Sequence, residues 1–145
     1  MSPPTRETAI SIAARLDHYD IAKVLIDHGA NINLSLRSFI WFPIFNAVEA
    51  EKPDLTSLLI ENGSYINVKN FNGLTPLRHA IVHNENQSQI IVLLRNRSDL
   101  NLKDYDGNNE IEGALDMKKM KALKLIAYHM STWNFQDYCT FWNRK

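Results

Sequence analysis

One recurring segment constrains the fold of this chain more than any other feature. Its best-preserved copy is Asn72-Gly-Leu-Thr-Pro-Leu-Arg-His-Ala-Ile81, where a turn-forming Asn-Gly pair precedes a Thr-Pro helix start and an apolar run. Degraded copies place Thr8, Phe42 and Asn109 where this copy has Thr75, and successive anchors are 34, 33 and 34 residues apart. Self-similarity at this period predicts a row of similar units that share one continuous core.

A second apolar segment follows each anchor, which predicts that every unit is a pair of helices. These segments span residues 21–26, 55–60, 90–94 and 122–126. We expect first helices near 8–16, 42–50 and 75–83, and second helices near 19–28, 53–62 and 88–96. Gly29 and Gly63 suit the left-handed backbone that ends a helix, and Arg97 takes the corresponding place in the third unit.

The segment Thr75-Pro-Leu-Arg-His-Ala80 resembles the Thr-Pro-Leu-His-x-Ala signature of the ankyrin repeat, with arginine in the histidine place. Gly29-Ala-Asn-Ile-Asn33 and Gly63-Ser-Tyr-Ile-Asn67 resemble the Gly-Ala-x-x-Asn ending of that family. The resemblance covers about residues 6–130 and implies an all-α solenoid with short β-hairpin turns, an ankyrin repeat stack. The resemblance also implies one ankyrin repeat domain over residues 1–130. Its repeats span about 6–37, 38–70, 71–104 and 105–130.

Residues 131–145 form an aromatic C-terminal tail that breaks the repeat pattern. Four of its side chains share one face at helical spacing: Phe135, Tyr138, Cys139 and Trp142. Two uses of this tail stay open. The first is a helix that caps the apolar end of the stack; the second is a peptide that docks on a second protein, or a remnant of a longer protein.

Composition excludes several classes of partner. The 16 basic and 16 acidic residues give a net charge of zero. The net charge of the whole chain therefore does not favour binding to nucleic acid or to an anionic membrane. No apolar run approaches the ~20 residues of a membrane span. The single cysteine cannot form an internal disulfide, and the first six residues carry no apolar signal core. We expect a monomer in the cytoplasm or the nucleus.

Chemistry-bearing motifs are absent from the sequence. It has no glycine-rich phosphate loop, no zinc-spaced Cys or His cluster and no Gly-x-Ser-x-Gly element. His79 and His83 stand four apart and could bridge a metal, but a third ligand is missing, so solvated histidines are favoured. The basic cluster near 118–124 is read as a solvated helix face, and Asp104 and Asp106 as turn formers. We therefore expect no catalytic residue, metal or cofactor.

The resemblance implies a non-catalytic module for protein–protein interaction, which binds a partner protein through its hairpin tips and concave face. A short stack of this size looks like the ankyrin core of inhibitors of NF-κB-type transcription factors and their viral or parasite mimics. It suggests a protein that masks or inhibits its partner. The alternatives are an adaptor that recruits a second partner through the aromatic tail, or a fragment of a larger enzyme or signalling protein.

Aromatic residues recur at the same position of the predicted hairpin tips, because Phe71 and Tyr105 each stand four residues before their anchor. Hairpin geometry does not require aromatic residues there. Large rings with few rotatable bonds are favoured at the energetic centres of interfaces. The alternative is that Phe71 and Tyr105 pack on neighbouring hairpins. The candidate protein-binding residues are Phe39, Trp41, Asn46, Phe71, Asn72, Leu74, His79, Tyr105, Asp106 and Asn108.

Three asparagines, Asn33, Asn67 and Asn101, end the first three repeats. Through the family resemblance they are candidate targets of a 2-oxoglutarate-dependent asparaginyl hydroxylase, whose targets in the family have a leucine several residues upstream, as Leu25, Leu59 and Leu93 are placed here. The alternative is that each amide simply hydrogen-bonds across the hairpins.

Repeat four departs most from the pattern, and Gly113 is its least favourable residue. Glycine inside a helix costs about 1 kcal/mol relative to alanine. The sequence therefore predicts that repeat four and the first helix are the least stable parts of the stack.

Overall fold

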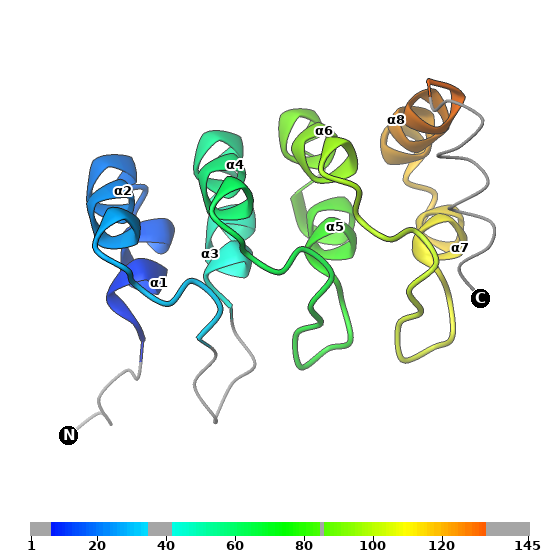
Figure 1. Ribbon diagram of the computed structural model, residues 1–145. Helices are drawn as coiled ribbons and strands as arrows, with labels where there is room; N and C mark the ends of the chain where they lie inside the picture. Colours follow the sequence, from blue (N-terminus) through cyan, green and yellow to red (C-terminus); the bar gives the residue numbers. More distant parts are fainter. Residues whose placement is uncertain (1–6, 35–41, 85, 133–145) are drawn as a thin grey trace.

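The computed structural model describes residues 7–34, 42–84 and 86–132. Four helix pairs stand side by side in one row, each contacting its neighbours (Figure 1). The first helices of the pairs are α1 (Ala9–Arg15), α3 (Pro43–Glu49), α5 (Pro76–His79) and α7 (Glu110–Asp116). The second helices are α2 (Tyr19–Asp27), α4 (Pro53–Glu61), α6 (Gln87–Arg95) and α8 (Met120–Ser131). The described ranges contain no strand, so the predicted all-α solenoid is confirmed.

All four predicted anchors are the residues that immediately precede a first helix. Thr8, Thr75 and Asn109 each accept a hydrogen bond from the N–H three positions on, at 2.9 to 3.2 Å. This contact satisfies an amide that the helix leaves without a partner. Phe42 has the same extended backbone without a capping side chain, and Pro43 fixes the first helical φ instead.

The second helices of the first three repeats end in the same left-handed backbone. Gly29 and Gly63 have φ values of 84° and 96°, and Arg97 adopts φ 64° at the third end. In each case the N–H of this residue and of the next one bonds to a carbonyl of the last helical turn, at 2.9 to 3.2 Å. The replacement of glycine by Arg97 therefore leaves the geometry of the helix end unchanged.

Repeat three contains one residue more between its anchor and its second helix than the other repeats. Gln87 follows Thr75 by 12 positions, whereas Tyr19 follows Thr8 by 11. The sequence places an α-helix over 75–83 and the extra residue in the turn 84–87 that follows it. Instead, α5 continues as the π-helix η1 (Ala80–Asn84), whose wider turn absorbs residues within the helix.

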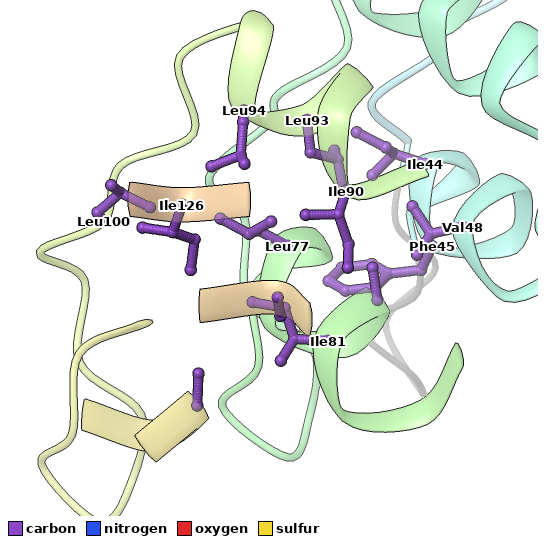
Figure 2. Packing of buried hydrophobic residues seen from close by; sticks show 13 residues of the cluster. Ile44, Phe45, Val48, Leu77, Ile81, Ile90, Leu93, Leu94, Leu100 and Ile126 are labelled. Carbon is purple, nitrogen blue, oxygen red and sulfur yellow. The ribbon is translucent and has the colours of Figure 1, made fainter. Parts of the chain in front are cut away.

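The apolar core runs along the row between the helices. Its larger cluster joins repeats two, three and four, where Phe45 of α3 lies near Ile81 and Ile90, and Ile126 extends the cluster to α8 (Figure 2). A smaller cluster joins repeats one and two. Within the described residues, no helix has both the length and the apolar character that a membrane span needs.

Candidate protein-binding surface

Two hairpin tips, at residues 70–74 and 104–108, project from the row on the side of the first helices (Figure 1). Asn70 is buried at the base of the first tip, and its Oδ1 accepts hydrogen bonds from the N–H groups of Asn72 and Leu74, both at 3.0 Å. Asp104 holds the second tip in the same way, also at 3.0 Å. The expected role of Asp104 as a turn former is confirmed, and one side chain organises each tip.

The aromatic residues of these tips are exposed. Phe71 is 56% exposed and Tyr105 is 72% exposed. The ring of Tyr105 nevertheless covers Gly73 of the preceding tip, because a Cβ built on Gly73 would lie 2.8 Å from the ring. Tyr105 therefore packs on its neighbouring hairpin, as the alternative reading supposed, and still leaves most of its surface uncovered.

The other candidate tip residues differ in exposure. Asn72 and Asp106 are exposed, whereas Leu74 and Asn108 are half-buried. Asn108 Nδ2 also donates to Asp116 Oδ2 of α7 at 3.2 Å. Phe39 and Trp41 lie outside the described residues.

Two candidate residues on the first helices are not on the surface. Asn46 is buried, and its Nδ2 donates to the carbonyl of Ser11 in repeat one at 3.2 Å. His79 is buried with its ring edge-to-face against Phe45 at 5.9 Å. Both stand four positions after their anchors and face the preceding repeat. The prediction that they are protein-binding residues on the surface is wrong, because the neighbouring repeat covers that side of the helix.

Burial also changes the reading of the histidine pair. The rings of His79 and His83 lie 4.5 Å apart, but the described residues contain no group of three or more potential metal ligands. Desolvation, together with nearby His83, lowers the pKa of His79 to about 4. His79 is therefore a neutral packing residue near pH 7, and not the solvated histidine that the sequence suggests.

The asparagines that end the repeats join consecutive repeats. Asn33 Nδ2 donates to the carbonyl of Gly63, and its Oδ1 accepts from the N–H of Tyr65, both at 2.9 Å. Asn67 Oδ1 accepts from the N–H of Asp99 one repeat further on, also at 2.9 Å. The side chains of Asn33 and Asn67 thus form the expected hydrogen bonds between hairpins. At Asn101, the backbone N–H donates to Asp99 Oδ1 at 3.0 Å, a bond within the same loop.

A buried charged cluster between repeats three and four was not predicted. Arg78 Nε lies 3.2 Å from Glu110 Oε2, and Arg78 Nη2 lies 3.3 Å from Asp104 Oδ2. Thr75 Oγ1 donates to the other oxygen of Glu110. Burial raises the pKa of Glu110 to about 7, although the Thr75 hydroxyl and the Arg78 guanidinium oppose the shift. Because the Asp104 carboxylate also organises the second tip, this cluster anchors that tip to α5.

Gly113 makes room for the cluster. A Cβ at this position would lie 1.2 Å from Arg78 Nη1, so no other residue fits without displacing the guanidinium. Three departures from the repeat pattern therefore share one cause: Arg78 in the histidine place, Glu110 in the proline place and Gly113 within α7. Their occurrence in consecutive repeats was the signal in the sequence that could have revealed the cluster.

Paired helices in one row, with capped starts, left-handed ends and projecting tips, define a helical repeat protein. Residues 5–35 match the family model of the ankyrin repeat, so the first repeat carries the family signature directly. The match covers one repeat, and together with the row of four helix pairs it is consistent with an ankyrin repeat protein.

A stretch of 45 residues is 44% identical to "Glycerophosphocholine phosphodiesterase GDE1" of Eremothecium gossypii. The match covers 31% of this chain and 3% of that relative. The chain therefore spans a very small part of the relative, and the shared stretch has the size of an ankyrin segment. The similarity supports the repeat assignment and transfers no phosphodiesterase activity.

Proposed function

We propose that this chain binds a partner protein across the hairpin tips 70–74 and 104–108 and masks the surface that it contacts. The observation that carries the proposal is the pair of exposed rings on adjacent tips, Phe71 and Tyr105. Ankyrin repeats generally mediate protein–protein interaction. The two rings expose apolar surface on the side of the stack where the hairpin tips project.

The construction of the tips supports this role. Aromatic side chains contribute large contact area with little rotamer entropy to lose, and they dominate the energetics of many interfaces. Asn70 and Asp104 fix the backbone that carries the rings. A pre-ordered binding surface loses less entropy on association than a mobile one.

The test compares Phe71→Ala and Tyr105→Ala with Tyr65→Ala, which removes an exposed ring outside the two tips. A partner captured from cell extract is purified, and its affinity for each variant is measured by calorimetry. We expect at least about a tenfold loss for a tip variant, equivalent to about 1.4 kcal/mol, and none for Tyr65→Ala. Unchanged affinity together with a lower Tm for both tip variants would contradict the proposal.

Masking is distinguished from recruitment by the effect on the partner. A masking protein should block the partner's binding to its own ligand in proportion to occupancy. An adaptor should leave that binding intact and lose a second protein when residues 133–145 are removed. A competition assay with the intact and shortened chains separates the two.

We also propose that the repeat-ending asparagines are substrates of an asparaginyl hydroxylase, with Asn67 modified first. Asn67 is exposed, whereas Asn33 and Asn101 are half-buried. Incubation with such an enzyme should add the mass of one oxygen, and peptide sequencing should place it on Asn67. An unchanged intact mass would exclude this modification.

A further inference from the structure

The first repeat exposes an apolar face that the other repeats bury. Ile21 stands 13 positions after its anchor and is 53% exposed. The equivalent residues Leu55, Gln89 and Ala122 are at most 1% exposed, because each faces the preceding repeat. Gln89, for example, donates to Thr56 Oγ1 of α4 at 2.7 Å. Ile21 occupies an interface position that has no repeat before it within the described residues.

Two further residues belong to the same face. Val24 is exposed although its equivalent Leu58 is buried, and Ile12 is exposed although its equivalents Asn46 and His79 are buried. We call Ile12, Ile21 and Val24 the upstream face. All three are large aliphatic residues that lie together on the exposed side of repeat one, as at a contact surface.

The fourth repeat shows the opposite half of this interface. Leu115 stands six positions after its anchor and is 57% exposed, whereas the equivalents Ala14, Val48 and Ile81 are fully buried. Leu123 of α8 is half-buried at a position where Ala22 is also fully buried. We call Leu115 and Leu123 the downstream face. The two faces are the two sides of a contact that forms three times inside the molecule.

Charges at the two ends are complementary. The α7–α8 turn and the start of α8 carry Lys118, Lys119, Lys121 and Lys124. Asp17 and Asp20 occupy the positions in repeat one that Lys118 and Lys121 occupy in repeat four. Neighbouring turns lie within ion-pair distance in this stack, since Lys52 Nζ is 3.0 Å from Asp17 Oδ2. Because Asp17 already pairs with Lys52 of repeat two, Asp20 is the aspartate that a basic turn placed before repeat one would meet.

We propose that the upstream face of repeat one binds the downstream face of repeat four of a second copy of this chain. The contact joins two different surfaces, so it leaves one free face at each end and adds copies head to tail. Association therefore grows with protein concentration, and the monomer expected from the sequence dominates in dilute solution. The hairpin tips stay uncovered, which makes this contact independent of the proposed partner binding.

The test uses one variant for each face, Ile21→Glu and Leu115→Glu, in the full chain. Sedimentation velocity over about a hundredfold range of concentration should show growing mass for the unmodified chain and a monomer for each variant alone. A mixture of the two variants should form a one-to-one dimer, because each retains the face that the other lacks. Circular dichroism establishes that the variants are folded.

Tyr128→Glu is the matched control. Tyr128 lies on α8 at a position whose equivalents Asp27 and Glu61 are exposed, so its substitution should leave association unchanged. An unmodified chain that stays monomeric over the whole range would overturn the proposal. So would variants that fail to combine while the unmodified chain associates, since that result indicates a symmetric contact. Association that starts only after residues 133–145 are removed would assign the downstream face to that segment and exclude a second copy.

Discussion

Gly113 is unfavourable for the helix that contains it and necessary for the contact between two repeats. By helix propensity alone, alanine at this position would add about 1 kcal/mol of stability. The space that its Cβ would occupy is filled by the Arg78 guanidinium, which is paired with Glu110 and Asp104. Displacing one partner of a buried ion pair leaves a charge without compensation.

We therefore expect Gly113→Ala to lower the free energy of unfolding by about 2 to 4 kcal/mol, opposite in sign to the propensity effect. Urea denaturation monitored by circular dichroism measures this change. The same substitution in an Arg78→Ala background should be neutral or stabilising, because the clash is gone. Equal losses in both backgrounds would mean that Arg78 is not the residue that excludes alanine.

Two buried titratable groups should give opposite pH dependences. Folding favours neutral His79, whose pKa is about 4, so its contribution to stability is lost as the pH falls from 6.5 towards 4. Folding favours protonated Glu110, whose pKa is about 7, so its contribution is lost as the pH rises from 4.5 towards 7. The two effects partly cancel in the intact chain.

The variant His79→Asn separates them, because repeat two carries asparagine at the equivalent position, Asn46. Relative to the unmodified chain, its free energy of unfolding should increase as the pH falls from 6.5 to 4. Denaturation curves at several pH values measure the difference. A difference that does not vary with pH would show that His79 titrates normally in the folded chain.

At the scale of the helices, α6 ends at a non-glycine residue with a left-handed backbone, a conformation that Asp17, Glu51 and Lys118 also adopt in the turns between helices. Arg97 adopts φ 64° where Gly29 and Gly63 end the preceding second helices. A left-handed backbone costs a residue with a Cβ roughly 1 to 2 kcal/mol, and glycine avoids this cost.

Arg97→Gly should therefore raise the free energy of unfolding by about 1 kcal/mol. Arg97→Ala is the control, because it removes the same side chain beyond the Cβ and keeps the Cβ. Thermal denaturation should show a higher Tm for the glycine variant only. If both variants gain stability equally, the benefit comes from removing the arginine side chain and not from the backbone.

Helix positions were predictable because their signals are local. Capping residues such as Thr8 and Thr75, and the glycines at helix ends, act within a few residues of themselves. The π-helix η1 was not predictable, since the extra residue fits equally well into a longer turn or a wider helix. In the structure α5 packs against α3 and α6, contacts between distant parts of the chain that the local sequence does not reveal.

The candidate surface was predicted in part for the same reason. The positions of Phe71 and Tyr105 follow from turn residues close to them in the chain. The burial of Asn46 and His79 depends on a neighbouring repeat, and the ion pair of Arg78 with Glu110 joins residues 32 positions apart. A histidine or arginine on a short helix does not indicate which of its sides the next repeat covers.

At the scale of the whole molecule, stability should be greatest in the middle of the row. Among the described residues, the most extensive contacts between helices of different repeats join adjacent repeats, so the two central repeats are covered on both sides and the two outer repeats on one. Hydrogen exchange should therefore be slowest in α3, α4 and α6, and faster in α1, α2 and α8. Uniform protection along the chain would contradict this order and indicate a single cooperative unit.

The fit between Arg78 and Gly113 limits how such a row can be rearranged by duplication or shuffling of its units. A duplicate of repeat three placed after the original would set Arg78 against a second His79 and a second Pro76, with neither space nor counter-charge for the guanidinium. A repeat four moved elsewhere would carry Glu110 away from its cation. The buried ion pair is therefore kept only when repeats three and four are duplicated or moved together, as one unit of about twice the usual length.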